Sequence, residues 1–302
     1  MDEALGLTAT EITVNVKNPT QKVHWFLAGD AHIGNISFDK KSFESLRKNI
    51  LLAARNSPVI ITFMGDVFDS IILGDKRYSP AEQNTSKTSS NIYFYEWLKP
   101  LMSNKNIIFN GFLLGNHEMT LAKKGVNSAQ EVEDKTGGRI KPYGCVTHNI
   151  IILKCNKKVG KLRSFLTHRS SNKKTQVALE SYAKECYLQV KKDTNLARVR
   201  VVASGHTHDL SYTTCKVSIP QPECKKILHD TIHVCRTGSF LKQDYDSPSY
   251  ATEAGHFGKP MGYIEVVFSM KCAKGEGDNI RVHERFNGDI DPNATFKLSG
   301  EI

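Results

Sequence analysis

Five short segments of this 302-residue chain place metal-binding types of side chain directly after apolar runs. They are GDAHIG (29–34), GDVFD (65–69), GNHE (115–118), THRS (167–170) and GHTH (205–208). Apolar runs such as VHWFLA and VIITFM are typical of buried β-strands, and the glycine that opens four of the segments permits a tight turn. Side chains that leave neighbouring strands in this way can converge on one ligand.

The candidate ligands comprise two carboxylates, one amide oxygen and four imidazoles: Asp30, His32, Asp66, Asn116, His168, His206 and His208. A mixed nitrogen and oxygen set suits Mn, Fe or Zn better than Ca. Seven ligands are too many for one tetrahedral ion and suit two ions that share a carboxylate. Each segment alone has an ordinary explanation, since aspartate often caps a helix and asparagine often holds a turn. Their succession along the chain favours a metal site.

This set of motifs resembles the calcineurin-like metallophosphoesterase superfamily, in which D-x-H, GD-x-x-D, GNH-[ED], a lone His and GH-x-H follow in this order over residues 24–208. The resemblance implies an α/β fold of two packed mixed β-sheets flanked by helices, a four-layer α-β-β-α sandwich. It also implies two divalent metal ions, with Mn expected first and Fe or Zn as alternatives. One ion would take Asp30, His32 and His208, the other Asn116, His168 and His206, and Asp66 would bridge them.

The expected chemistry is hydrolysis of a phosphate ester by a metal-bridging hydroxide. His117 follows the ligand Asn116, and we expect it to give a proton to the leaving oxygen as general acid. Asp69 matches the second aspartate of GD-x-x-D, which in the protein-phosphatase branch pairs with that histidine; the alternative is a carboxylate at a helix N-terminus. Glu118 is expected to be structural.

Charge and one motif position bear on the substrate. The chain has 41 Lys and Arg against 31 Asp and Glu, a net charge of +10, which favours an anionic partner such as nucleic acid or nucleotides. Protein phosphatases usually carry arginine directly after GD-x-x-D, where this chain has Ser70, although Arg169 could supply a charge. We therefore expect a phosphodiesterase or nuclease first, a nucleotide or protein phosphomonoesterase second, and a non-catalytic scaffold third.

Periodicity predicts a single α/β domain over 1–302, with the metal motifs in 29–208 and completing strands and a tail in 209–302. The sequence predicts strands at 23–28, 59–64, 107–114, 146–153, 162–166 and 199–203, helices at 41–55, 91–98 and 174–192, an exposed loop at 79–91, further strands within 211–270, and a tail from 271 of loops plus one edge strand. The aromatic residues of 91–98 could stack on bases, but core packing explains them better. The segment 239–263, which contains His256, could lie near the site.

The remaining features point to an ordinary intracellular protein. No apolar run approaches the ~18 residues of a membrane helix, and the N-terminal residues lack the basic and apolar regions of a signal peptide. We expect a cytoplasmic protein without membrane association. The seven cysteines form no CxxC pair, so reduced thiols are expected, with a zinc site at Cys215, Cys224 and Cys235 as a weak alternative.

Overall fold

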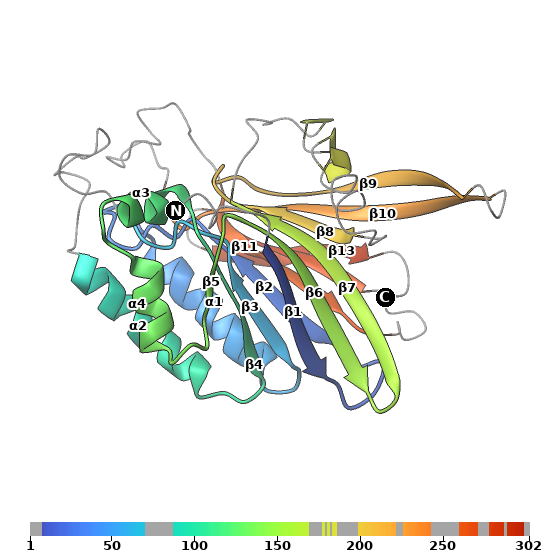
Figure 1. Cartoon of the computed structure of the whole chain (residues 1–302), viewed down its shortest axis with the longest axis horizontal. Helices are drawn as coiled ribbons and strands as arrows, with labels where there is room; N and C mark the ends of the chain where they lie inside the picture. Colours follow the sequence, from blue (N-terminus) through green and yellow to red (C-terminus); the bar gives the residue numbers. More distant parts are fainter. Residues whose placement is uncertain are drawn as a thin grey trace.

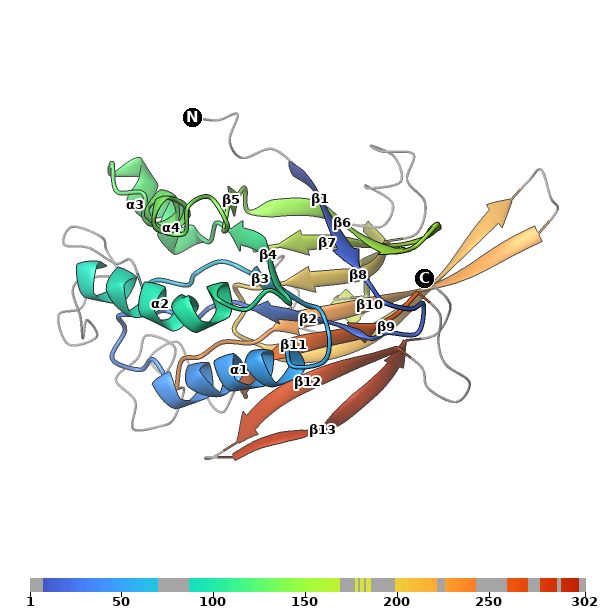
Figure 2. The same ribbon diagram turned by 90° about the horizontal axis from the view of Figure 1, so that it is seen from below.

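The computed structural model describes residues 8–69, 87–168, 177–178, 180–181, 183–185, 199–221, 226–242, 260–270, 278–286 and 289–298. Two mixed β-sheets, one of seven strands and one of six, pack face to face (Figure 1). The described helices α1–α4 gather on the side of the seven-stranded sheet (Figures 1 and 2).

Three parallel strands at the centre of the seven-stranded sheet carry the first ligand motifs. They are β2 (Val23–Ala28), β3 (Val59–Phe63) and β4 (Ile107–Leu113), which pair in that order. α1 (Lys40–Ala53) connects β2 to β3, and α2 (Lys87–Met102) lies between β3 and β4 in the chain. Because parallel strands place their carboxyl ends at one edge of a sheet, the segments that follow β2, β3 and β4 meet there.

The outer strands of this sheet come from later in the chain. β5 (Pro142–Tyr143) pairs in parallel with β4. On the other side of β2 lie β11 (Met261–Phe268), β12 (Asp278–Phe286) and β13 (Asp289–Leu298), all antiparallel to their neighbours. Between β4 and β5 the chain forms the short helices α3 (Asn116–Lys123) and α4 (Ser128–Lys135). The strands after residue 208 thus complete both sheets, as the sequence predicts.

The six-stranded sheet carries the last two ligand motifs. Its order is β1 (Thr8–Asn15), β6 (Val146–Cys155), β7 (Lys158–Thr167), β8 (Val199–Ser204), β10 (Lys226–Thr237) and β9 (Leu210–Gln221). β7 and β8 are parallel, so the segments that follow them also leave at a common edge. β9 and β10 form a long hairpin whose far end extends beyond the other strands (Figure 2).

Apolar side chains hold these layers together in three clusters. One lies between the sheets and includes Trp25 and Leu166, and a second packs α1 and α2 onto the seven-stranded sheet through Phe43 and Trp97. The third covers the opposite face of the six-stranded sheet and includes Ala183, from the helical residues 183–185. The two sheets are therefore one packed unit that can hold strand-end segments from both in fixed positions.

Most predicted elements are confirmed, with corrections at the edges. α2 begins at Lys87, so residues 87–91 are helical and the predicted loop at 79–91 was too long; 79–86 lie outside the described residues. The tail forms two paired strands, β12 and β13, instead of one edge strand. β1, α3 and α4 were not predicted, because eight-residue elements with mixed polar patterns give a weak periodic signal.

Two further expectations can be compared with the structure. The aromatic residues Phe94 and Trp97 are buried and stack in the helix core, which confirms packing as their role. Of the predicted helix at 174–192, the described residues within 177–185 are helical. No helix among the described residues is long and apolar enough to cross a membrane.

Candidate metal centre

The first group of ligand-type side chains, which we call the inner trio, consists of Asp30, His32 and His208. Asp30 and His32 follow β2 and His208 follows β8, so the trio joins the two sheets. The Nε2 atom of His208 lies 3.2 Å from Nε2 of His32 and 3.4 Å from Oδ1 of Asp30. All three side chains are buried. A carboxylate and two imidazole nitrogens thus face one another away from water.

The second group, the outer trio, consists of Asp66, His168 and His206. Asp66 follows β3, His168 follows β7 and His206 follows β8. Nε2 of His168 lies 3.0 Å from Oδ2 of Asp66, and its Nδ1 donates to the carbonyl oxygen of Met64 at 2.5 Å. That bond fixes the ring orientation and turns Nε2 toward the trio. His206 is exposed, so this trio is open to solvent on one side.

The backbone at these ligands is strained. Of the six non-glycine residues with positive φ among those described, five are candidate ligands: Asp30 (+50°), His32 (+49°), Asp66 (+48°), His206 (+76°) and His208 (+56°). Each residue held in the left-handed region costs roughly 1–3 kcal/mol. Such strain is typical of functional sites, where the surrounding structure must hold it in place.

Backbone hydrogen bonds between the segments provide that support. The N–H of Asp30 donates to Gly65 O at 2.9 Å, and that of His32 donates to Asp66 O at 3.0 Å. The N–H of His206 donates to Oδ2 of Asp30 at 2.8 Å. The β2, β3 and β8 ends are therefore tied directly to one another, and the two trios share a common frame.

Glycines at the starts of the motifs leave room for the ligands. A Cβ atom on Gly115 would lie 2.0 Å from Oδ1 of Asp66, and one on Gly65 would lie 2.5 Å from Nδ1 of His168. Gly65 also has φ +92°, which side-chain-bearing residues rarely adopt. These glycines are required by close approach to the ligands as well as by turn geometry.

Asp69 contacts two imidazole rings at once. Its Oδ1 lies 3.2 Å from Nδ1 of His32 and 3.4 Å from Nδ1 of His117, and its Oδ2 accepts from Asn35 at 2.9 Å. The predicted pairing of Asp69 with His117 is therefore present in the geometry. The contact with the ligand His32 and the support from Asn35 were missed, because neither pairing has a sequence signal.

His117 is the second residue of α3 and its side chain is buried. Its backbone N–H donates to Oδ1 of Asp66 at 2.9 Å. Its ring meets that of His32 edge to face, with ring centroids 4.6 Å apart. The residue before it, Asn116, opens α3 directly beside Gly115 and is half-buried. The structure thus brings the GNHE segment to the trios, while coordination by the Asn116 amide and the bridging role of Asp66 stay predictions.

Glu118 has the structural role that the sequence suggests. Its carboxylate accepts from the backbone N–H groups of Asp66 (3.0 Å), Phe68 (3.2 Å) and Gly115 (2.9 Å). Burial and the neighbouring charge of Asp66 raise the pKa of Glu118 to about 7. One buried side chain therefore joins the GDVFD turn to the GNHE turn.

The charges in the trios are strongly coupled. Burial alone would raise the pKa of Asp66, but His168 and His117 hold it well below its ordinary value. Burial would also raise the pKa of Asp30, but His168 and His208 lower it below its ordinary value. Burial disfavours a proton on His168, yet Asp66 and Asp30 raise its pKa to about 10. The carboxylates thus attract positive charge, and a metal cation competes with the proton for the same nitrogen.

The pKa of Asp69 is also lowered, which favours the charged carboxylate. Burial would raise its pKa, but the hydrogen bonds and charges of His117 and His32 keep it far below the ordinary value. A buried carboxylate beside a metal-ligand histidine orients the ring and increases its basicity. Asp69 is therefore placed to orient the candidate ligand His32 and the candidate acid His117 together.

Two further contacts near the trios were not foreseen. Asp209, directly after His208, accepts from Nη1 of the buried Arg236 at 2.8 Å, which fastens the GHTH segment to β10. The N–H of Phe240 donates to Asp30 O at 3.1 Å, so the start of the 239–263 segment does reach the site. Residues 243–259, including His256, and Arg169 lie outside the described residues.

Comparisons with known proteins identify no relative. No family model matches the chain, and no curated protein matches it. The site must therefore be interpreted from its own geometry.

The residues present fit divalent cations. Each trio combines one carboxylate with two imidazoles whose ligand atoms all lie within 4.8 Å of one another, the donor chemistry that Mn, Fe and Zn accept. A third group with the same composition, His32, Asp69 and His117, shares His32 with the inner trio. In the described part of the chain, the cysteines take part in no such group, and Cys145, Cys155, Cys215 and Cys235 are free thiols. Cys224 of the alternative zinc site lies outside the described residues.

Proposed function

We propose that the chain is a dinuclear metal-dependent phosphoesterase of the calcineurin-like superfamily. One observation carries the proposal: two carboxylate–imidazole trios lie side by side at the strand ends, with the His117–Asp69 pair against them. The inner trio is the first ligand set implied by the motif resemblance, and the outer trio contains His168 and His206 of the second set with the expected bridging residue Asp66, but without Asn116. A single trio would be compatible with a structural ion, whereas a double site with an adjacent acid suits catalysis.

The layer order supports the same assignment. Helices cover the seven-stranded sheet, the two sheets pack together, and helical residues 183–185 lie on the far face through Ala183. We interpret this order as the four-layer α-β-β-α sandwich of that superfamily. Fold alone does not define activity, so the proposal depends on the site.

The roles of the residues follow from their positions. Asp30, His32 and His208 would hold one divalent ion, Asn116, His168 and His206 would hold the other, and Asp66 would be shared by both. Two such ions, for which Mn is the first expectation, would supply an activated water and neutralise charge on the phosphate. His117 gives its ring proton to the leaving oxygen, and Asp69 holds that ring.

A phosphodiester is the favoured substrate class. The net charge of +10 favours polyanions, and Ser70 replaces the arginine typical of protein phosphatases. A phosphomonoesterase is the second candidate, because the same two-ion chemistry hydrolyses monoesters. A non-catalytic scaffold is disfavoured, since every candidate ligand and His117 are retained.

The test is hydrolysis of bis-p-nitrophenyl phosphate and p-nitrophenyl phosphate by the Mn²⁺-loaded full chain, with His117→Ala as control. We expect Mn²⁺-dependent hydrolysis with preference for the diester, lost in His117→Ala. Preference for the monoester would move the assignment to a phosphomonoesterase. No hydrolysis of either compound by protein that has bound metal would overturn the proposed activity and favour a scaffold.

A further inference from the structure

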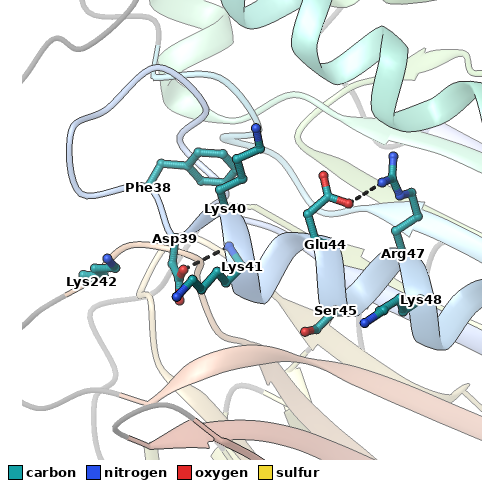
Figure 3. A pocket seen from close by; sticks show the side chains of 9 residues that line it. All are labelled: Phe38, Asp39, Lys40, Lys41, Glu44, Ser45, Arg47, Lys48 and Lys242. Atoms are coloured by element: carbon teal, nitrogen blue, oxygen red, sulfur yellow. Dashed lines mark hydrogen bonds and ion pairs between the residues drawn. The ribbon is translucent and has the colours of Figure 1, made fainter.

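A cavity of about 800 Å³ lies on the outer side of α1 and is lined mainly by basic side chains (Figure 3). Lys41, Ser45 and Lys48 point along one side of the helix, and Lys242 lies beyond its N-terminal end. The spacing 41, 45, 48 places the three helix residues on one face. We call Lys41, Lys48 and Lys242 the basic row.

Basic side chains outnumber acidic ones in the lining of the cavity, with Lys40, Lys41, Arg47, Lys48 and Lys242 against Asp39 and Glu44. Asp39 caps α1, where it accepts from the N–H of Lys41 and from the hydroxyl of Ser42 at 2.6 Å. Glu44 pairs with Arg47 on the other side of the helix and accepts from Tyr93 (Figure 3). Within the described part of the chain, the three lysines of the row have no acidic partner, and all three are exposed. The row therefore presents exposed positive charge that is available to bind an anion.

The cavity also contains an aromatic ring. Phe38 is half-buried and packs edge to face against Phe43, with ring centroids 5.6 Å apart, and against Tyr93 at 5.8 Å. These neighbours hold its ring, which lines the cavity at the N-terminal end of α1, on the side that carries Lys40 and Glu44 and across the helix from Lys41 and Lys48 (Figure 3). A positively charged groove with a fixed aromatic ring is the usual combination for binding unpaired bases along a phosphate backbone.

The backbone connects this cavity to the metal centre. Phe38 lies six residues after the inner-trio ligand His32 and bridges to Leu241. The N–H of Asp39 donates to Phe240 O at 2.7 Å, and the N–H of Phe240 donates to Asp30 O at 3.1 Å. Two successive hydrogen bonds thus join the start of α1 to a candidate ligand, so a chain bound in the cavity is held in a fixed relation to the trios.

We propose that the basic row and Phe38 bind a single-stranded nucleic acid and present its phosphodiester backbone to the metal centre. The inference rests on the proposed phosphoesterase function and names its substrate class. Lys41 and Lys48 are separated by about 10 Å along the helix axis. In a duplex each strand carries one charge per about 3.4 Å of axis, so the two lysines are far enough apart to contact different phosphates of one strand. The stacking ring selects an unpaired strand over a duplex.

The test compares two triple variants of equal charge. Lys41→Gln/Lys48→Gln/Lys242→Gln removes the row, and Lys154→Gln/Lys157→Gln/Lys158→Gln removes three exposed lysines at the β6–β7 turn. That turn lies at the opposite end of β7 from His168, about 30 Å away. Binding of a fluorescein-labelled oligothymidylate is measured by anisotropy in the Mn²⁺-loaded full chain, with His117→Ala in every protein so that the strand stays intact.

Loss of the row should weaken binding about tenfold or more and reduce the salt slope by about 2, while the control triple should change affinity less than twofold. Phe38→Leu should weaken single-stranded binding without changing duplex binding. With His117 restored, the control triple should hydrolyse bis-p-nitrophenyl phosphate at the wild-type rate. This last assay separates the proposed phosphoesterase activity from the proposed strand binding. Absence of hydrolysis would refute the activity, whereas the anisotropy measurement would still show whether the cavity binds the strand.

Three results would overturn the inference. Equal weakening by both triple variants would mean that net charge alone attracts the strand. Unchanged oligothymidylate binding by the row variant would remove the cavity from recognition. An effect on ATP or on duplex binding, with single-stranded binding unaffected, would assign the cavity to a different ligand.

Discussion

The inner and outer trios have the same donor chemistry but different access to solvent. Asp30 and His32 of the inner trio are 0 % exposed and His208 is 7 % exposed, whereas the outer trio includes the exposed His206. Both trios take one histidine from the same GHTH segment, two residues apart. Two positions with a single residue between them at the end of β8 therefore differ enough to direct one imidazole into the interior and leave the other at the surface.

This difference suggests a division of labour within the proposed site. A buried ligand set exchanges its ion slowly, because opening it requires local unfolding of strand-end segments. An open set can exchange its ion and admit a substrate oxygen. The side chains of His117 and Asp69 contact the inner trio through His32, and the backbone N–H of His117 donates to Asp66 of the outer trio, so the proposed acid lies between the two halves of the site.

The largest expected effect is that of Asp66→Asn. If Asp66 bridges the two ions, the variant should lose both and with them the metal-dependent activity, since each ion supplies several kcal/mol of transition-state stabilisation, about 10³-fold or more in rate. Metal content by mass spectrometry and hydrolysis of the diester test this together. If the variant retained one ion, Asp66 would be a ligand in the outer trio only. If it retained both ions, Asp66 would not be a ligand.

His117→Ala should retain both ions and lower turnover by about 10²–10⁴-fold, the usual contribution of a general acid. The loss should be greatest for poor leaving groups, which need the proton most. A uniform loss across leaving groups would contradict the role of acid.

The trios can be compared directly with the matched variants His206→Gln and His208→Gln. Since even outer-shell partners of a metal contribute about 10–100-fold to affinity, each loss of a ligand should weaken one ion by more than tenfold. His206→Gln should affect the readily exchanging ion and leave the melting temperature of the metal-free protein unchanged. His208→Gln should affect the slowly exchanging ion and lower that temperature. Titration with Mn²⁺ and thermal melts measure both, and the reverse pattern would refute the inner and outer distinction.

Asp69→Asn should have a moderate effect of about 10–100-fold on activity, because it removes a positioning contact of His32 and His117 together. The Asp69 carboxylate stabilises the protonated ring of His117, so its removal should lower the pKa of that ring. The alkaline limb of the pH–rate profile should therefore move to lower pH. An unchanged profile would show that Asp69 acts on the ligand alone.

The smallest expected effect is on stability. Free Mn²⁺ at 100 times its dissociation constant should stabilise the chain by about 2.7 kcal/mol, which raises the melting temperature by about 5 °C. Scanning calorimetry with and without chelator measures this shift. Asp30→Asn should remove the part of the shift that comes from the inner-trio ion, and an unchanged shift in that variant would place the stabilising ions elsewhere.

The sequence located the candidate ligands better than their surroundings. Asp30, Asp66, His168 and the two GHTH histidines follow apolar strands, and a strand end is visible in sequence because burial requires a continuous apolar run. The sequence also identified Asp69 as the partner of His117.

The parts that could not be predicted depend on long-range contacts. The Asn35–Asp69 and Asp209–Arg236 contacts, the left-handed backbone at the ligands and the approach of Phe240 to Asp30 arise only when the two sheets pack. No periodic pattern encodes them. The basic row is similar, because Lys242 joins the α1 lysines only through the fold.

The most direct test of the account is the anomalous scattering of manganese in crystals of the Mn²⁺-loaded chain. The account predicts two peaks, one among the nitrogen and oxygen atoms of Asp30, His32 and His208 and one among those of Asp66, His168 and His206. A single peak, or peaks outside both trios, would contradict a dinuclear centre.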